Sequence, residues 1–375
     1  MRARVLIVGA GPAGLATAAA LAGHGIEARL IDRNPDVGGA YARMDPDLLM
    51  TTPSALVGLP GLAAPRGAPY LTAAGYHRYL VAYAEHHRLR AERAAVAAVA
   101  PLGRGYRITL TAPDPIADGT AEPGDALAPG AAPDPIDVDA VVLATGMFDT
   151  PVRPTLLGLP ADGPADGARP RVVHAGAWRI ADARAGQRVL IIGGASSAVE
   201  IAEACARADA VVTVSVRDAI AISPATVLGH DPTLLLMPLL ARLPPALAPG
   251  FCAGRRAVPA ADRGFGALRR AGRIAVVPAV ARIDGRAVVL VDGRRLDVDV
   301  IVLATGYRHA VAPAPAALVR DDRGVPRTVD GQSRSHPGLF VVGAPCVRRA
   351  ASQYVYGMAR DAPAIARAIV ARLRS

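Results

Sequence analysis

The first 32 residues limit most strongly what this chain can fold into. An apolar stretch, residues 5–8, precedes the pattern Gly-x-Gly-x-x-Gly at Gly9, Gly11 and Gly14. An alanine-rich helix and a second strand follow, and that strand closes at Asp32, 18 residues after Gly14. In such a unit the glycines provide a tight turn, backbone approach to a pyrophosphate and close helix packing. The pattern therefore predicts a dinucleotide site, with phosphates at the helix N-terminus and a ribose at Asp32.

Two other interpretations of this stretch are weaker. A glycine-rich turn in an ordinary α/β unit would explain the glycines but not the acid at the expected distance. A secretory signal would explain Arg2 and Arg4 ahead of an apolar run with small residues behind it. The glycines interrupt that run, and the later pattern needs this strand in a sheet. We therefore expect a sheet strand here.

Composition narrows the class of protein and its partners. A length of 375 residues with 52% hydrophobic residues fits two domains with substantial cores. We find no apolar run long enough to span a membrane. The net charge of +10 comes from arginine, scattered along a chain without lysine, and only 4% of residues are aromatic. We expect no nucleic-acid or membrane partner, whereas a basic chain suits anionic cofactors.

The three cysteines, Cys205, Cys252 and Cys346, lie far apart and form no C-x-x-C pair. This spacing predicts no structural zinc site, no disulfide framework and no dithiol redox pair. It also points to a reducing cytoplasm as the compartment. No metal ligands are predicted.

An internal repeat indicates a second unit. Residues 137–146 read Asp-Val-Asp-Ala-Val-Val-Leu-Ala-Thr-Gly, and residues 297–306 repeat this with two changes. Each segment predicts a buried strand that leaves the sheet, near a cofactor, through Ala-Thr-Gly. Coincidence of two valine-rich strands is the alternative. The near identity favours two related dinucleotide units.

Between the repeats lies a second strand–glycine–helix pattern, residues 187–217. Gly193, Ala195 and Ala198 occupy the three glycine positions of the first motif. The third position commonly tolerates alanine, but Ala195 places a methyl group where a pyrophosphate approaches.

Neighbouring residues bear on that second site. Ser196 and Ser197 can partly compensate for Ala195 by donating to phosphate oxygens. Arg217 follows the second strand, where the first motif has Asp32. An arginine suits a 2′-phosphate and a carboxylate suits a 2′-hydroxyl, so the sequence predicts NADP rather than NAD. A plain surface arginine is the alternative.

The remaining segments are assigned more coarsely. We expect irregular structure over 45–70, a mobile loop over 112–135, and no assignment over 218–270. The other predicted elements are helices over 76–89 and 352–373, strands over 94–99, 106–111 and 338–343, and a β-meander over 273–306.

The order of these motifs resembles that of two-dinucleotide-domain flavoproteins, and among them the flavin-containing monooxygenase-like group, which is related to pyridine nucleotide-disulfide reductases. The resemblance rests on the two glycine motifs, the Gly38–Gly39 pair, both Ala-Thr-Gly segments and Gly-Leu-Phe-Val-Val-Gly at 338–343. It implies an α/β fold with two Rossmann-like domains. An FAD domain would comprise 1–146 and 307–375, with an NADP domain, 147–306, inserted between them.

The resemblance implies that FAD is reduced by NADPH and that oxygen is trapped as a C4a-(hydro)peroxyflavin. One oxygen atom would then pass to a small organic substrate. The site residues it implies include one candidate catalytic residue, Thr52, where the family often has asparagine. The residues predicted to bind the cofactors are Gly9, Gly11, Pro12, Ala13, Gly14, Asp32, Arg33, Gly39, Tyr41, Thr52, Val96, Thr145, Gly146, Gly193, Ala195, Ser196, Ser197, Arg217, Thr305, Gly306, Gly343 and Ala344.

The family pattern is also matched in part by His174 and Trp178, for which a hydrogen-bonded linker histidine and a packed tryptophan are the alternative. Ala344 stands where disulfide-reductase relatives carry aspartate. Two other functions stay open: an NADPH-dependent reductase or oxidase of a disulfide, quinone or similar acceptor, and a non-catalytic flavin-binding module. A disulfide reductase would need a lone reactive thiol, for which Cys346 is the candidate. A homodimer is possible.

Overall fold

The computed structural model describes residues 4–113, 134–165, 169–252, 259–309, 313–322 and 324–375. The chain forms two units. Unit 1 comprises Met1–Asp149, Thr233–Ala253 and His309–Ser375, and unit 2 comprises Thr150–Pro232 and Gly254–Arg308. The segment Thr233–Ala253, which we call the excursion, was assigned to the second domain from sequence but packs in unit 1. The predicted mobile loop, 112–135, falls almost wholly outside the described residues.

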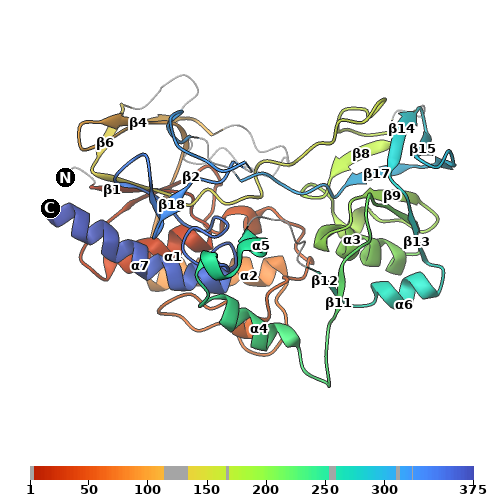
Figure 1. The fold of residues 1–375 in the computed structure, drawn as a ribbon, viewed down its shortest axis with the longest axis horizontal. Helices are drawn as coiled ribbons and strands as arrows, with labels where there is room; N and C mark the ends of the chain where they lie inside the picture. The colour runs from red at the N-terminus through yellow and green to blue at the C-terminus, as the bar shows by residue number, and fades with distance from the viewer. Residues whose placement is uncertain (1–3, 114–133, 166–168, 253–258, 310–312, 323) are drawn as a thin grey trace. The chain divides into compact units, whose positions relative to one another are not determined.

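Unit 1 is built on a seven-stranded sheet (Figure 1). Its order is β18 (Thr328–Val329), β19 (Gln332–Ser333), β20 (Leu339–Val341), β7 (Ala140–Leu143), β1 (Val5–Val8), β2 (Arg29–Asp32) and β3 (Ala91–Arg93). The strands from β20 to β3 run parallel. All four residues of β1 are apolar and buried, because a central strand is covered on both faces.

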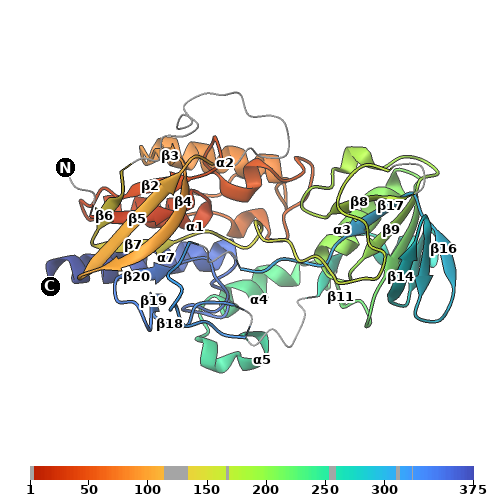
Figure 2. The same cartoon turned by 90° about the horizontal axis from the view of Figure 1, so that it is seen from above.

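The two faces of this sheet are covered differently. On one face lie α1 (Pro12–Ala22), α2 (Ala73–His86) and α7 (Val355–Arg374), whose apolar residues share a cluster with Ile7 and Val142 of the sheet. On the other face lies an antiparallel sheet of β4 (Ala95–Leu102), β5 (Gly105–Thr111) and β6 (Ile136–Val138), seen from above in Figure 2. Alternate residues of β5 are buried, which is why its sequence alternates.

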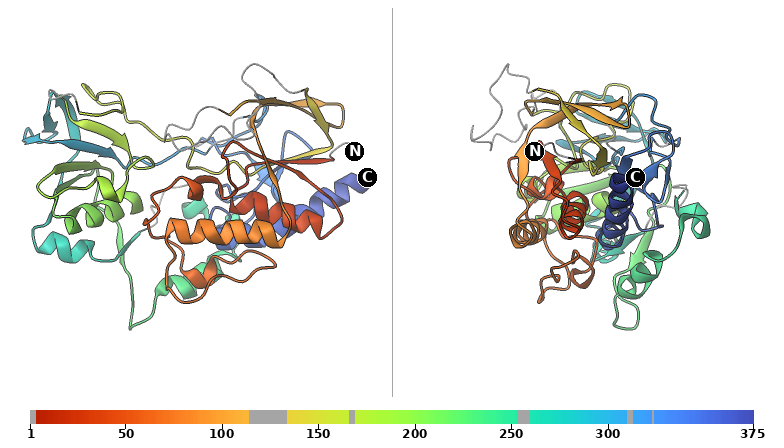
Figure 3. Two further views of the ribbon diagram at one scale, coloured as in Figure 1. Left: turned by 180° about the vertical axis from the view of Figure 1, so that it is seen from behind. Right: turned by 90° about the vertical axis from the view of Figure 1, so that its left-hand side faces the viewer.

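Unit 2 is a five-stranded parallel sheet (Figure 3). Its order is β13 (Ile274–Val277), β10 (Val211–Ser215), β9 (Arg188–Ile192), β17 (Val300–Leu303) and β8 (Arg171–His174). Helices α3 (Ser196–Arg207) and α6 (Phe265–Arg270) pack on one face. The antiparallel strands β14 (Val280–Asp284), β15 (Ala287–Leu290) and β16 (Arg295–Asp297) cover the other.

The predicted class, α/β with two Rossmann-like domains, is confirmed. The details differ in two places. The helix expected over 76–89 begins at Ala73, because the Thr72 hydroxyl caps it by accepting the Gly75 N–H at 3.0 Å. The β-meander expected over 273–306 is limited to β14–β16, because β13 and β17 join the parallel sheet.

The stretch without an assignment, 218–270, contains short elements. Strands β11 (Ile222–Pro224) and β12 (Ala260–Asp262) pair in unit 2. Between them come α4 (Pro232–Leu240), η4 (Pro245–Leu247) and α5 (Pro249–Cys252). In the described part of the chain, no helix combines the length and apolarity needed to cross a membrane.

Candidate dinucleotide sites

The first glycine turn joins β1 to α1 and requires glycine at two positions. Gly9 has φ +106°, and a Cβ there would stand 2.5 Å from the Ala144 carbonyl oxygen. A Cβ at Gly14 would stand 1.8 Å from the Gly9 carbonyl oxygen. Both distances are impossible for real atoms. The glycines therefore allow α1 and the first Ala-Thr-Gly segment to pack closely against the turn. We call the two Ala-Thr-Gly segments, residues 144–146 and 304–306, the first and second crossing.

Gly11 differs, because protein packing does not require it. It is the N-cap of α1 with ordinary extended backbone, and a Cβ would meet only Gly39 Cα, at 3.9 Å. No side chain caps α1, so its first-turn N–H groups, including those of Ala13 and Gly14, are free of a side-chain cap. The loop after β2 is joined to this turn, because the Gly38 N–H donates to the Ala10 carbonyl oxygen at 2.9 Å. This open space beside uncapped N–H groups fits a pyrophosphate.

Asp32 is tied to the turn rather than pointing away from it. One carboxylate oxygen accepts the Ala10 N–H at 2.6 Å, and the other accepts the backbone and side-chain N–H groups of Asn34 at 2.8 and 2.7 Å. Burial raises the pKa of Asp32, and these hydrogen bonds oppose that rise. The oxygen that accepts the Ala10 N–H keeps a lone pair for a ribose, so Asp32 can hold the turn and contact a ligand at the same time.

Two other predicted contacts of the first site are engaged within the protein. Arg33 pairs with Asp149 at 2.6 Å, and Arg43 pairs with the same carboxylate. Tyr41 meets Tyr76 edge to face at 4.8 Å, and burial raises the pKa of Tyr41 to about 12. The sequence did not predict the ion pairs with Asp149, because this residue lies far from Arg33 and Arg43 in the chain.

The remaining predicted residues of unit 1 are spread around the turn. Gly343 has φ +77° and lies against α1, where its Cβ would stand 3.0 Å from Ala13 Cβ. Ala344 is fully buried and Thr52 is 6% exposed. Val96 lies on β4, in the antiparallel sheet. The structure thus brings Gly343 to the turn and leaves Val96 on another sheet.

The second glycine turn, between β9 and α3, has the same construction. Gly193 has φ +139°, and its Cβ would stand 2.2 Å from the carbonyl oxygen of Ala304 in the second crossing. This matches the approach of Gly9 to Ala144. In both units the crossing alanine donates its N–H to the last residue of the first strand, at 2.9 Å. The sequence repeat is therefore a structural repeat.

Backbone hydrogen bonds show which residues of the two turns correspond, and they change the comparison of Arg217 with Asp32. In the first turn the leading glycine donates its N–H, at 2.7 Å, to the residue directly before Asp32. In the second turn Gly193 donates in the same way to Ser215, at 3.0 Å. The position of the acid is therefore taken by Val216, and Arg217 comes one residue later. An uncharged residue followed by an arginine leaves nothing to repel a 2′-phosphate.

Ala195 fits the second turn without strain. It is the N-cap of α3 with φ −101° and ψ −174°, close to the −75° and −174° of Gly11. Its side chain is exposed, so the methyl group faces solvent rather than protein. Ser196 and Ser197 form the first turn of α3, which no side chain caps. The site therefore offers N–H and hydroxyl donors to an anion.

The second crossing is held by hydrogen bonds within unit 2. The Thr305 hydroxyl donates to the Val152 carbonyl, and His174 Nε2 lies 3.1 Å from the Gly306 carbonyl oxygen. His174 Nδ1 accepts the Gly176 N–H, so Nε2 carries the proton, and burial lowers the pKa of His174. His174 and Thr305 thus serve as structural contacts here.

The first crossing has a histidine contact that sequence reasoning missed. The His309 imidazole hydrogen-bonds to the backbone of Gly146, and burial lowers its pKa to about 4. The neutral ring thereby connects the two ends of unit 1 that flank unit 2 in sequence. The signal available was a histidine three residues after the second Ala-Thr-Gly.

The cysteine prediction needs correction. Cys252 and Cys346 form a disulfide, with Cα atoms 5.7 Å apart and a sequence separation of 94. Cys205 is fully buried as a free thiol, and burial raises its pKa to about 12. Cys346 is therefore not the lone thiol that a disulfide reductase would need. Within the described ranges we find no cluster of three or more His, Cys, Asp or Glu residues that could hold a metal.

Comparisons with known proteins agree with this architecture. Residues 7–86 match the model of an NAD(P)-binding Rossmann-like domain, and residues 132–230 match that of a pyridine nucleotide-disulphide oxidoreductase. The probable indole-3-pyruvate monooxygenase YUCCA8 of Arabidopsis thaliana is 26% identical over 90% of this chain and 83% of its own length.

Solved structures share the fold over nearly the whole chain. The flavin-containing monooxygenase from Stenotrophomonas maltophilia has a TM-score of 0.75 at 22% identity, with 98% of each chain covered. Bacillithiol disulfide reductase Bdr from Bacillus cereus has a TM-score of 0.71 at 19% identity, covering 99% of this chain and all of that one. The predicted resemblance to flavin-containing monooxygenase-like proteins is confirmed.

Proposed function

We propose that this protein is an NADPH- and FAD-dependent monooxygenase that transfers one oxygen atom from O₂ to a small organic substrate. The observation that carries the proposal is the pair of glycine turns with different side chains at the ribose position. The first turn presents Asp32, which suits an unphosphorylated ribose. The second presents Val216, which cannot repel a 2′-phosphate, followed by Arg217. The first turn also has an arginine at this next position, Arg33, but that arginine pairs with Asp149. The relatives named as monooxygenases support the choice of chemistry.

In this proposal the protein binds and orients the cofactors, while the flavin supplies the oxygen chemistry when bound. The N-terminus of α1 and Gly11 hold one pyrophosphate, and Asp32 holds the adjoining ribose. The N-terminus of α3, with Ser196 and Ser197, holds the other pyrophosphate. Thr52 is buried in the segment before η2 (Ser54–Leu56), so its hydroxyl is a polar group in a region from which water is largely excluded.

A second candidate function is an NADPH-dependent reductase or oxidase of a disulfide, quinone or similar acceptor. It is favoured by the fold shared with bacillithiol disulfide reductase. The bonded state of Cys346 weakens the disulfide version, because that thiol is not available to attack a substrate. The non-catalytic interpretation is disfavoured, because Ala195 has extended backbone and an exposed side chain, so the second turn is intact.

One experiment separates these functions. FAD-loaded protein is reduced by NADPH without oxygen, then mixed with oxygenated buffer while flavin absorbance is recorded. The monooxygenase predicts a transient spectrum between those of reduced and oxidised flavin, and one oxygen atom recovered in product from ¹⁸O₂. Direct reoxidation with stoichiometric hydrogen peroxide indicates an oxidase. Failure of NADPH to reduce the flavin indicates the non-catalytic module.

Two finer predictions belong to the same proposal. A homodimer stays a prediction, as does a cytoplasmic location. A reducing cytoplasm is predicted from cysteines that form no disulfide, and the Cys252–Cys346 bond means that the cysteines no longer support this location. Size-exclusion chromatography with light scattering tests the first, and cell fractionation tests the second.

A further inference from the structure

The excursion, Thr233–Ala253, is attached to the rest of unit 1 by a small apolar contact. None of the residues of α4 is buried, and Leu235 and Leu239 are 84% and 54% exposed. Ala241 is buried, and it packs against Ala351 and Tyr356 at the start of α7. Met237 and Leu240 of α4 are partly buried against the same cluster.

Polar contacts add to it, among them a hydrogen bond from the Tyr356 hydroxyl to Met237 Sδ of α4 at 2.5 Å. The Ala350 N–H donates to the Leu243 carbonyl at 3.0 Å, and the Arg349 guanidinium donates to the Arg242 carbonyl at 3.2 Å. The Cys252–Cys346 disulfide is the covalent attachment, and it lies at the far end of the excursion from α4. It therefore adds a covalent link to these non-covalent contacts.

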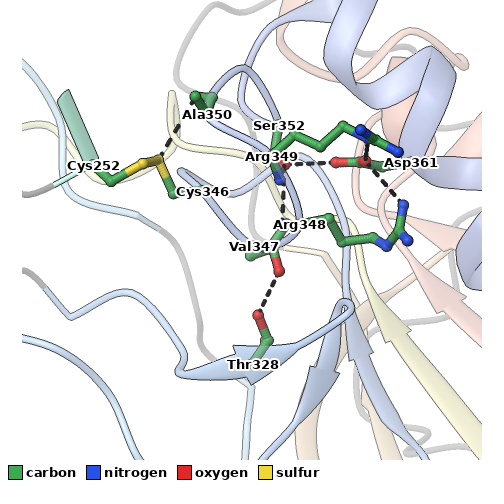
Figure 4. Close-up of a disulfide and its surroundings, with 9 residues drawn as sticks. All are labelled: Cys252, Thr328, Cys346, Val347, Arg348, Arg349, Ala350, Ser352 and Asp361. Atoms are coloured by element: carbon green, nitrogen blue, oxygen red, sulfur yellow. Dashed lines mark hydrogen bonds and ion pairs between the residues drawn. A yellow bond between two sulfur atoms is a disulfide. The ribbon is translucent and has the colours of Figure 1, made fainter. Parts of the chain in front are cut away.

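The two ends of the disulfide differ in how firmly they are held (Figure 4). Cys346 begins a loop anchored by the fully buried carboxylate of Asp361 on α7. Asp361 accepts a hydrogen bond from the Ser352 hydroxyl at 2.6 Å and pairs with Arg348 at 3.3 Å and Arg349 at 3.6 Å. Cys252 lies at the end of the four-residue helix α5, in the weakly packed excursion.

The bond is also open to exchange chemistry. Both cysteines are partly exposed, so a thiolate from solvent can reach a sulfur. The Ala350 carbonyl oxygen lies 3.6 Å from Cys346 Sγ, which gives the thiol formed on reduction a hydrogen-bond acceptor. Cys346 has φ +54°, a conformation that favours glycine.

We propose that Cys252–Cys346 is a reversible thiol–disulfide site that fastens the excursion to unit 1. The reductant is a dithiol in solution. Its thiolate attacks one sulfur of the pair, forms a mixed disulfide and displaces the other cysteine as a thiolate, which takes up a proton. The second thiol of the reductant, as its thiolate, then releases the first cysteine, which is protonated in turn. The protein gains two electrons and two protons, and the reductant becomes a disulfide. Cys346 stays in its anchored loop, and Cys252 leaves with the excursion.

This site goes beyond the proposed function and does not depend on it. The apolar cluster that holds Ala241 of the excursion includes Leu56, which lies four residues after Thr52 in sequence. Release of the excursion loosens one side of the segment that carries Thr52.

The first test counts thiols on the native full-length protein before and after dithiothreitol. The air-oxidised protein is expected to show no reactive thiol under native conditions, since Cys205 is buried, and one in denaturant. Reduction is expected to expose two in the native state, and mass spectrometry of the unreduced digest to show the Cys252 peptide linked to that of Cys346. Two reactive thiols before reduction, with no linked peptide, would overturn the proposal.

The second test follows the position of the excursion by limited trypsin digestion. Arg242 is the arginine of the excursion and is exposed, so cleavage after it reports on local release. Reduction, or Cys252→Ser with Cys346→Ser, is expected to speed this cleavage about tenfold or more. Arg242→Gln must abolish the cut, and Cys205→Ala must leave its rate unchanged. An unchanged rate after reduction would refute the fastening role. Neither readout needs FAD, NADPH or turnover, so it stands apart from the proposed function.

Discussion

Arg217→Ala is expected to weaken NADPH binding and leave NADH binding nearly unchanged. A charge-assisted pair with a phosphate contributes about 1.5–3 kcal/mol. Arg217 is exposed, so water and salt screen part of that interaction. We therefore expect the lower end, about 1.5 kcal/mol, which is roughly a tenfold rise in the dissociation constant for NADPH.

The register of the second turn supplies a complementary change. Val216 holds the place of Asp32, so Val216→Asp puts a carboxylate beside the ribose. That carboxylate can accept hydrogen bonds from a 2′-hydroxyl and repels a 2′-phosphate. The variant should lose NADPH affinity by a similar factor and gain affinity for NADH.

Anaerobic stopped-flow reduction of the FAD-loaded protein measures both cofactors on one sample, since the dependence of rate on concentration gives each dissociation constant. Arg217→Lys keeps the charge and should recover part of the loss. Arg282→Ala removes another exposed arginine of unit 2 and should change nothing. Equal losses for NADPH and NADH in Arg217→Ala would show that Arg217 serves the pyrophosphate or the fold, and the argument from register would fail.

Three further predictions concern residues of the two glycine turns and of helix α3. Glu200→Gln should raise the free energy of unfolding by about 1–3 kcal/mol at pH 8, because burial raises the Glu200 pKa to about 7 and the folded state holds an ionised carboxylate at a cost. Wild type regains this stability as pH falls from 7 to 4.5, so the gap should close in urea titrations over that range, and a constant gap would contradict the assignment. Ala195→Gly should change NADPH affinity little, while Ser197→Ala weakens it; tight binding that appears only in Ala195→Gly would show a blocked site. Gly9→Ala should abolish FAD retention on gel filtration, because its methyl group would stand 2.5 Å from the Ala144 oxygen; normal retention would show that the turn can open.

The glycine turns could be predicted from sequence because each glycine, and the alanine carbonyl against it, belongs to a recognisable motif. Gly9 meets the Ala144 carbonyl and Gly193 meets the Ala304 carbonyl, and the Ala-Thr-Gly repeat marks both alanines although they lie far from the glycines in sequence. The strand 5–8 was predictable for a similar reason, since four consecutive apolar residues suit burial on both faces.

The features that sequence did not predict depend on distant partners. Cys252 and Cys346 lie 94 residues apart, and only the folded chain brings them together. Helix α4 escaped assignment because Pro238 interrupts it and none of its residues is buried, so it has no apolar periodicity. The sequence pattern aligns Arg217 with Asp32, whereas the backbone hydrogen bonds align Val216 with Asp32. The end of a strand is set by such hydrogen bonds, which the sequence does not show.

That single residue alters the argument for the second cofactor. The two turns share backbone hydrogen bonds and crossings, so a difference in ligand must come from side chains. Asp32 accepts the Ala10 N–H, and we predict that it also contacts the ribose, whereas the Val216 side chain can accept no hydrogen bond. The second turn has therefore lost a carboxylate. It keeps an arginine one residue later, Arg217, where the first turn has Arg33 paired with Asp149. Because the missing carboxylate and the neighbouring guanidinium act in the same direction, the preference for a 2′-phosphate should survive partial loss of either. Only Val216→Asp together with Arg217→Ala should reverse it fully.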